Sequence, residues 1–225
     1  MTPSLPAPDR NTLISTTTTL VLVAVLGVAA LWQATAGFRA VSSEDVRRIE
    51  VSESPRTLPP TTLATAGGEH VALSQILASD GRVAIVTFIY TSCNSICTVL
   101  GDEFQQLQRA IKSRGLQDDI RLISISFDPA DKPEHLRRYS SSLQADASLW
   151  QFAGIPDGAE RRALLRSFGV VVVPAPLGQF QHNAAFHGVS SDGKLMRIID
   201  YDAPDAALAA AMQLRSRPIA AAGKS

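Results

Sequence analysis

VAIVTFIYTSCNSIC, residues 83–97, joins a continuous apolar run to the two cysteines of the chain, Cys93 and Cys97. Such a run, rich in β-branched and aromatic side chains, is typical of a strand buried on both faces. Past the cysteines, apolar residues at helical spacing predict the core face of a helix from about Ser95 to Ala110: Leu100, Phe104, Leu107 and Ile111. We therefore expect the two thiols where a buried strand passes into a helix.

The spacing of the two cysteines bears on their chemistry. Residues four apart on a helix have Cβ atoms roughly 5–6 Å apart, whereas a disulfide needs about 3.5–4.5 Å. Two thiolates on one face can instead hold a soft ion such as Cu(I), and a helix N-terminus favours deprotonated sulfur. Metal binding is therefore at least as natural here as redox cycling. Cysteines buried without a chemical role, or a structural disulfide in an oxidising compartment, are the alternatives.

A second feature is an uncharged segment near the N-terminus, residues 11–35, between Arg10 and Arg39. A membrane-spanning helix needs about 20 apolar residues and a signal-peptide core about 7–15. The segment fits either, and we expect a transmembrane anchor over residues 13–36. Arg10 before the anchor favours a tail inside the cell. The main domain would then lie on the periplasmic side of a bacterial inner membrane.

The rest of the chain suits one domain, because 225 residues are enough for a single well-buried core. We expect the following boundaries: an N-terminal tail at residues 1–12, a linker at 37–60, a domain at 61–216 and a C-terminal tail at 217–225. Lysine plus arginine and aspartate plus glutamate number 21 each. This balance gives no overall field that would attract nucleic acid, so we expect no nucleic-acid partner.

The fold class follows from the order of periodic segments. Helices are expected at residues 132–143, 157–168 and 205–215, and strands at 83–90, 120–127, 149–153 and 170–173, with hairpins at 67–73 and 185–199. This order predicts an α/β fold, a thioredoxin-like sandwich with a central mixed β-sheet flanked by helices. The cysteines fall at the end of the first strand–helix unit, where open sheets bind ligands.

Three separated motifs resemble those of the Sco/SenC family. They are FIYTSCNSIC at residues 88–97, SISFDPADKP at 124–133 followed by Tyr139 and Trp150, and HNAAFH at 182–187, which begins ten residues before Asp192-Gly193. The resemblance covers roughly Thr61 to Asp200. Two departures stand out: Asn94 and Thr98 occupy positions where the family has prolines, and the segment Pro174–Gln181 is short and uncharged.

The resemblance implies a membrane-anchored thioredoxin-fold protein that handles copper for cytochrome c oxidase assembly. It implies Cu(I) bound by Cys93, Cys97 and His182, and two thiolates with one imidazole do form a compact site for a soft ion. Cu(II) could also be held if a further ligand or water joined. The implied partner is the copper-site subunit of a cytochrome oxidase or another copper chaperone.

The choice among the four histidines favours His182 by its distance from the Asp-Gly turn. His187 is the competitor, but residues five apart on an extended strand point to opposite faces, so only one can face the cysteines. We expect His187 to be a half-buried strand residue, and His70 and His135 to be solvated.

Other polar and aromatic residues have simpler expected roles. Asp128 would close a turn and Asp131 would cap the next helix, with an outer-shell role at the site as the alternative. Phe88 and Tyr90 would shape the site rather than react.

Two classes of function remain open. The first is a copper chaperone, which is not an enzyme in the strict sense. The second is a thiol-disulfide oxidoreductase, with Cys93 and Cys97 as the redox pair. A thiol peroxidase or a copper or redox sensor has no separate support in the sequence. His182 discriminates between the two main hypotheses, because thiol exchange does not need it.

Overall fold

The computed structural model describes residues 10–34, 42–93 and 96–216. It divides into two compact units, residues 1–49 and 50–225. Helix α1 (Arg10–Ala34) covers most of the segment predicted as an anchor, while residues 35–36 of that segment lie outside the described residues. Within the part of the chain that the structure describes, no helix combines the length and hydropathy that a membrane crossing requires.

The segment expected to be a linker contains two regular elements, helix α2 (Ser43–Glu53) and strand β1 (Arg56–Thr57). The helix begins with a local cap, in which the backbone N–H of Asp45 donates to Ser42 Oγ at 3.2 Å. Glu44 and Asp45 lie in its first turn, where carboxylates stabilise a helix. The prolines that suggested a linker, beginning with Pro55, follow the helix and end it.

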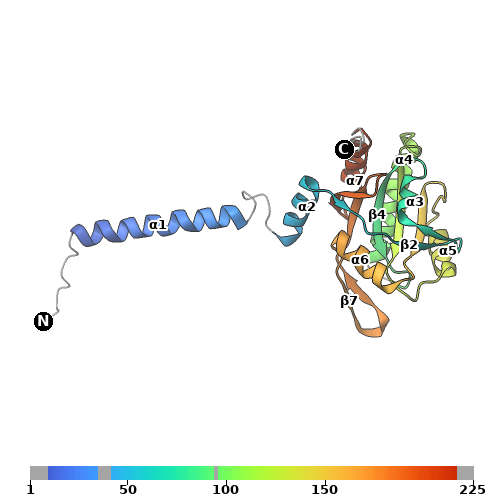
Figure 1. Ribbon diagram of the computed structural model, residues 1–225, viewed down its shortest axis with the longest axis horizontal. Coiled ribbons are helices and arrows are strands. Elements are labelled where there is room, and N and C mark those ends of the chain that lie inside the picture. The colour runs from blue at the N-terminus through green and yellow to red at the C-terminus, as the bar shows by residue number, and fades with distance from the viewer. Residues whose placement is uncertain (1–9, 35–41, 94–95, 217–225) are drawn as a thin grey trace, which may run out of the picture. The chain divides into compact units, whose positions relative to one another are not determined.

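The larger unit is built on a mixed sheet. Its eight strands, counted over the described residues, lie in the order β1-β10-β9-β4-β5-β6-β2-β3 (Figure 1). Their bounds are β2 (Thr62–Thr65), β3 (His70–Ala72), β4 (Val83–Ile89), β5 (Ile120–Ser126), β6 (Trp150–Gly154), β9 (Ala185–Val189) and β10 (Lys194–Asp200). Strands β4, β5 and β6 are parallel, and β9 pairs antiparallel with β4. The predicted central mixed sheet is confirmed.

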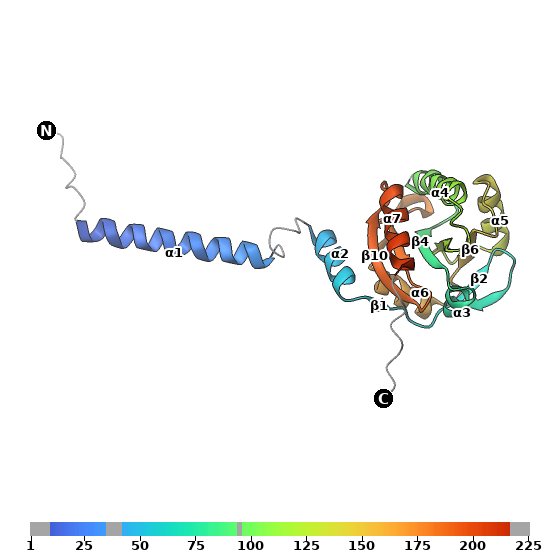
Figure 2. The same ribbon diagram turned by 90° about the horizontal axis from the view of Figure 1, so that it is seen from above.

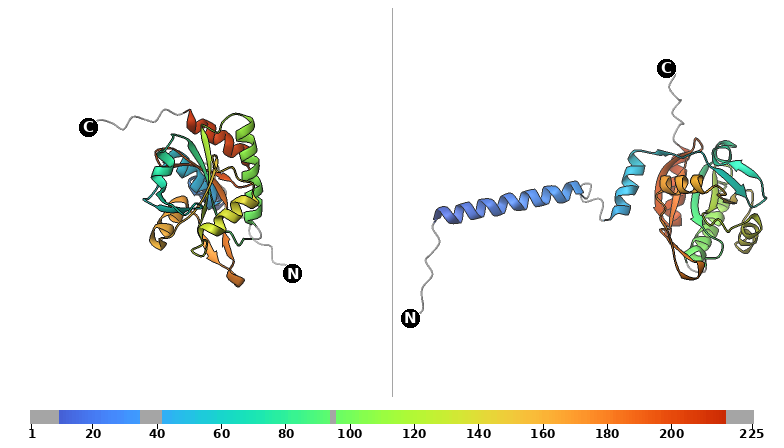
Figure 3. Two further views of the ribbon diagram at one scale, coloured as in Figure 1. Left: turned by 90° about the vertical axis from the view of Figure 1, so that its right-hand side faces the viewer. Right: turned by 60° about the horizontal axis from the view of Figure 1, so that its bottom comes forward.

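Helices cover both faces of this sheet, as Figures 2 and 3 show. Their bounds are α3 (Leu73–Ala78), α4 (Ile96–Ser113), α5 (Pro133–Ser142), α6 (Gly158–Phe168) and α7 (Pro204–Arg215). The limits of α6 follow the sequence signals: Asp157 accepts the N–H groups of Ala159 and Glu160 at 2.8 Å, and Gly169 ends the helix at φ 68°. Short α3, directly after β3, was not predicted.

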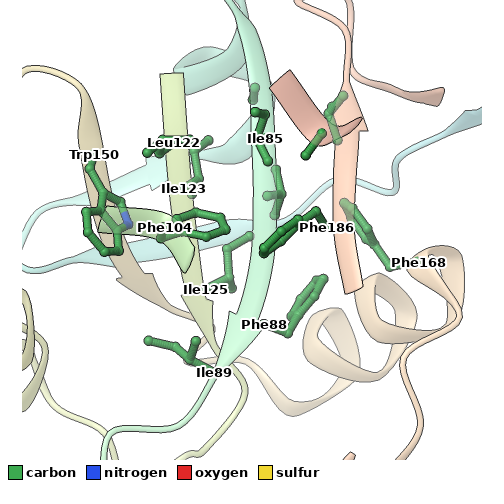
Figure 4. Close-up of a cluster of buried hydrophobic side chains, with 14 of the residues drawn as sticks. Ile85, Phe88, Ile89, Phe104, Leu122, Ile123, Ile125, Trp150, Phe168 and Phe186 are labelled. Atoms are coloured by element: carbon green, nitrogen blue, oxygen red, sulfur yellow. The ribbon is translucent and has the colours of Figure 1, made fainter. Parts of the chain in front are cut away.

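The core divides along β4, whose alternate residues face opposite sides of the sheet (Figure 4). Phe88 packs on the ring of Phe168 from α6, with centroids 5.0 Å apart. On the other face, Phe104 of α4 contacts the rings of Trp150 and Phe186 at 5.4 and 5.3 Å. The predicted core stripe of α4 is confirmed, since Leu100, Phe104, Leu107 and Ile111 are all buried.

A short hairpin lies apart from the main sheet. Strand β7 (Val172–Pro174) pairs antiparallel with β8 (Phe180–His182), and the one-turn helix η1 (Pro176–Gly178) connects them. Figure 1 shows this β7–β8 hairpin extending beyond the ends of the central strands. The extended segment predicted at residues 170–173 is thus a strand, but its partner is the segment that carries His182.

Candidate metal centre

The first half of the site is the turn that follows β4. The backbone N–H of Cys93 donates to the carbonyl of Tyr90 at 3.3 Å, and the Cys93 side chain is buried. The backbone N–H of Phe127, one residue past the end of β5, donates to the carbonyl of Ile89, the last residue of β4, at 3.0 Å. The Cys93 turn therefore starts from a fixed position at the carboxyl ends of the parallel strands.

Asp131 clamps this turn from the loop that follows β5. Its side chain is 2% exposed. It accepts the N–H of Thr91 at 2.8 Å and the hydroxyl groups of Thr91 and Ser126. The carboxylate thus ties the end of β4 to the end of β5. It contacts the segment that leads to Cys93, as a residue that supports the site without binding the metal would.

The expectation that Asp131 caps helix α5 is wrong, because the N-cap residue is Lys132. Asp128 does close the predicted turn: its carboxylate accepts the N–H of Ala130 at 2.8 Å. His135 also differs from expectation, since it is half-buried, with its Nδ1 accepting the N–H of Lys132 at 3.2 Å and lying 4.0 Å from Asp131 Oδ1.

The second cysteine stands at the start of α4. Cys97 is in the first turn of this helix, but its side chain, like Asn94 and Ser95, lies outside the described residues. Cys93 precedes the helix, so the distance expected for two side chains on one helical face does not apply to the pair. The structure describes one predicted sulfur ligand and leaves the other as a prediction.

His182 forms the opposite half of the site, at the end of β8. Its ring centroid lies 5.1 Å from that of Phe127 and 6.4 Å from that of Tyr90, and Nδ1 is 3.4 Å from the carbonyl of Asn183. Burial lowers the pKa of His182, while the Asn183 carbonyl and the charge of Cys93 act in the opposite direction. The lowered pKa favours the neutral imidazole, which is the form that binds metals.

His187, the competing histidine, lies in the core. It is 1% exposed rather than half-buried as predicted, and its Nδ1 lies 3.2 Å from the carbonyl of Val86. The rings of Phe88 and Phe168 contact it at 5.8 and 5.0 Å. The premise that both histidines share one extended strand is also wrong, because β8 and β9 belong to different sheets. The fourth histidine, His70, is exposed on β3 as expected.

Sequence reasoning missed the role of the Tyr90 hydroxyl in this arrangement. Tyr90 is 1% exposed, and its Oη contacts Gln179 and Phe180 of the β7–β8 hairpin. A signal was present, because a tyrosine at the end of a buried strand needs a partner for its hydroxyl. Among the side chains that the structure describes, no group of three or more histidine, cysteine or acidic residues is placed to hold a metal. Cys97 is not among those side chains.

The chain is similar to known proteins over this whole domain. Residues 52–215 match the family model described as SCO1/SenC. A SCO1 protein homolog from Bacillus subtilis is 31% identical over 147 residues, which is 64% of this chain and 72% of that protein.

Solved structures agree with this match. BsSco, described as a member of the Sco family of cytochrome c oxidase assembly proteins with a disulfide switch, is 26% identical with a TM-score of 0.63, over 73% of this chain and 96% of that one. ScoI from Bradyrhizobium japonicum, solved with copper bound, is 25% identical with a TM-score of 0.58, over 71% of this chain and 99% of that one.

Proposed function

Because the chain belongs to the SCO1/SenC family, we propose that it is a copper chaperone that binds Cu(I) through Cys93, Cys97 and His182. It would deliver the ion to a copper site of a respiratory cytochrome oxidase, directly or through another copper chaperone. Two relatives support the two halves of this proposal: BsSco is described as a member of a cytochrome c oxidase assembly family, and ScoI holds copper.

The observation that carries the proposal is the pairing of Cys93 with His182. A buried thiol and a half-buried, neutral imidazole come from segments about ninety residues apart and lie within electrostatic reach of each other. Sulfur and imidazole nitrogen are the donors that Cu(I) prefers, and Cys97 would supply a second thiolate from the first turn of α4. Cu(II) could be held by the same residues with one further ligand.

The arrangement suits delivery as well as binding. Cys93 comes from the turn after β4 and Cys97 from the start of α4, and the third ligand comes from a hairpin that, over the described residues, does not pair with the main sheet. A receiving protein could displace His182 first and then take the ion from the two sulfurs. Stepwise replacement of ligands avoids the cost of releasing free Cu(I) into water.

We extend the proposal to location: residues 13–36 would hold the domain on the periplasmic side of a bacterial inner membrane. The absence of charge from Asn11 to Thr35 supports it. In a fractionated bacterial host, the full chain should stay with the membranes through a carbonate wash. A variant that lacks residues 10–34 should be released. Release of the full chain would contradict the tether.

Thiol-disulfide exchange is the second candidate function, favoured by the disulfide switch described for BsSco. One thiolate would attack a client disulfide and expel a client thiolate. The other cysteine would then resolve the mixed disulfide. The client would gain two electrons and two protons, and Cys93 and Cys97 would form a disulfide.

An anaerobic titration with Cu(I) against a competing chelator tests the main proposal on the reduced protein. The parent should bind one copper. Removal of an outer-shell partner alone costs about 10–100-fold in metal affinity, so His182→Ala should weaken binding by at least about 100-fold. The matched control is His70→Ala, on an exposed strand position, which should leave binding unchanged.

Equal affinity in the parent and in His182→Ala would refute the three-ligand site. Reduction of a client disulfide should then be measured instead, with Cys93→Ser and Cys97→Ser as the inactive controls.

A further inference from the structure

The Tyr90 hydroxyl joins the two halves of the candidate centre. Its Oη accepts the backbone N–H of Phe180 at 3.3 Å and lies 3.2 Å from the carbonyl oxygen of the same residue. Gln179 Oε1 is 3.1 Å away. Because a phenol has one proton to donate, the two acceptors share it, and the hydroxyl is held by up to three groups of the hairpin.

The residues joined by the Tyr90 hydroxyl each lie close in the chain to a predicted copper ligand. Tyr90 ends the buried run and stands three residues before Cys93, with its own carbonyl bonded to the Cys93 N–H. Phe180 stands two residues before His182 on β8. A single hydroxyl therefore connects the backbone beside one predicted ligand to the backbone beside another.

Strand pairing does little to hold the β7–β8 hairpin against the rest of the domain. Over the described residues, β7 and β8 pair only with each other. At the base, the side chain of Asn183 accepts the N–H of Val171 at 2.7 Å and donates to the carbonyl of Gly169 at 3.0 Å. Further along β8, the ring of Phe180 packs on Phe127 and Tyr90, with centroids 5.6 and 5.2 Å apart. Ring contacts allow sliding, whereas the hydroxyl bonds fix a register.

We propose that Tyr90 is a positioning residue, whose hydroxyl holds the β7–β8 hairpin in the register that places His182 opposite Cys93. This inference rests on the proposed function, since it takes His182 to be a copper ligand. In this proposal Tyr90 is not a metal ligand and acts only through His182. Without the hydroxyl, His182 would be near the sulfurs for only part of the time, and copper would be held mainly by the two cysteines.

Tyr90→Phe tests this directly, because the ring and its packing remain and only the hydroxyl is lost. One net hydrogen bond corresponds to a change of about three- to tenfold in an equilibrium constant. We expect the Cu(I) affinity of the reduced domain to fall by that factor.

A double-mutant cycle separates positioning from a general structural effect. Cu(I) affinity is measured for the parent, Tyr90→Phe, His182→Ala and the double variant. If Tyr90 acts through His182, its substitution weakens binding in the parent and changes nothing in the His182→Ala background. An equal loss in both backgrounds, or no loss in the parent while His182→Ala is impaired, overturns the inference and leaves the proposed function standing. A silent His182→Ala overturns both.

A second readout needs no copper. The Phe180 amide donates to Tyr90 Oη, so its hydrogen exchange in the apo protein should be about three- to tenfold faster in Tyr90→Phe. Tyr139→Phe is the matched control. This half-buried tyrosine of α5 packs on Phe152 at 6.1 Å, away from the hairpin. It should leave the Phe180 exchange rate unchanged, and an equal response of that amide in the two variants contradicts the assignment.

Discussion

Two hairpins follow one another late in the chain, and each carries one histidine. The β9–β10 hairpin lies within the main sheet, because β9 pairs with β10 on one side and with β4 on the other. The β7–β8 hairpin is a two-stranded sheet of its own, joined to the domain through side chains such as that of Tyr90. Backbone ladders hold the first hairpin and side-chain contacts hold the second.

This difference between the hairpins explains why the two histidines lie in different environments. His187 sits in β9, is closed in by Phe88 and Phe168, and serves the core. His182 sits at the end of β8, is half-buried, and packs near Tyr90, whose carbonyl accepts the N–H of Cys93. If His182 binds and releases copper as proposed, the hairpin that can move without breaking the main sheet is the better place for it.

The largest expected effect compares one phenylalanine from each hairpin. Phe186 of β9 is fully buried, so Phe186→Ala should lower the free energy of unfolding by about 3–5 kcal/mol. Phe180 of β8 is half-buried and should cost about 1–2 kcal/mol when changed to alanine. Denaturant unfolding of the apo domain measures both.

For Cu(I) affinity we expect the opposite order, with the larger loss in Phe180→Ala. Per folded molecule, Phe180→Ala should weaken Cu(I) binding, because Phe180 adjoins both Tyr90 and Phe127 around His182. Phe186→Ala should weaken it less, since Phe186 packs on Phe104 of α4, seven residues past Cys97 in the chain. If the loss of copper affinity follows the loss of unfolding free energy in both variants, the β7–β8 hairpin has no special part in copper binding.

Asp131 allows a test of the cysteine half of the site. Asp131→Asn removes the charge and replaces one acceptor oxygen with a donor, so the bonds from Thr91 and Ser126 lose their charge assistance and one partner must turn or go unpaired in a buried place. A loss of about 1–3 kcal/mol in unfolding free energy is expected. Unlike Tyr90→Phe, this variant should still weaken Cu(I) binding when His182 is already alanine, because the clamp acts on the Cys93 turn. Binding that no longer responds in that background would mean that Asp131 acts through the hairpin instead.

Much of the fold could be predicted because local signals and tertiary structure agree. The apolar run before the cysteines, the Asp157 and Gly169 caps, and the Asp192-Gly193 turn each fix an element without help from distant residues. The resemblance to the Sco/SenC family rests on short continuous motifs, each of which joins two consecutive elements, and the comparisons confirm it.

The site was less predictable, because its contacts join distant parts of the chain. A short acidic residue after a strand is as consistent with a helix cap as with a clamp, and only the tertiary structure brings Asp131 to Thr91, forty residues away. Likewise, no spacing in the sequence reveals that β8 leaves the main sheet, so the two histidines were treated as residues of one strand. The bond from Tyr90 to Phe180 spans ninety residues for the same reason.

The smallest expected effect concerns acid and the turn of the β9–β10 hairpin. The hydroxyl of Ser190 and then the ammonium of Lys194 lower the pKa of Asp192 below its ordinary value of 3.8. A carboxyl with a lowered folded-state pKa stabilises the fold above pH 3.8, and this contribution is lost as pH falls through the folded-state value. Since the side chain is 37% exposed, screening should limit it to a few tenths of a kcal/mol.

Asp192→Asn should therefore be slightly less stable than the parent at pH 6 in denaturant unfolding, and the difference should shrink as the pH falls below 3.8. Residues 170–181 of the neighbouring hairpin carry no charge, so the Phe180 amide should keep the same exchange protection in both proteins at pH 6. If Asp192→Asn also lowers the exchange protection of the Phe180 amide, the two hairpins are coupled. Movement of His182 during the proposed copper release would then also require movement in the main sheet.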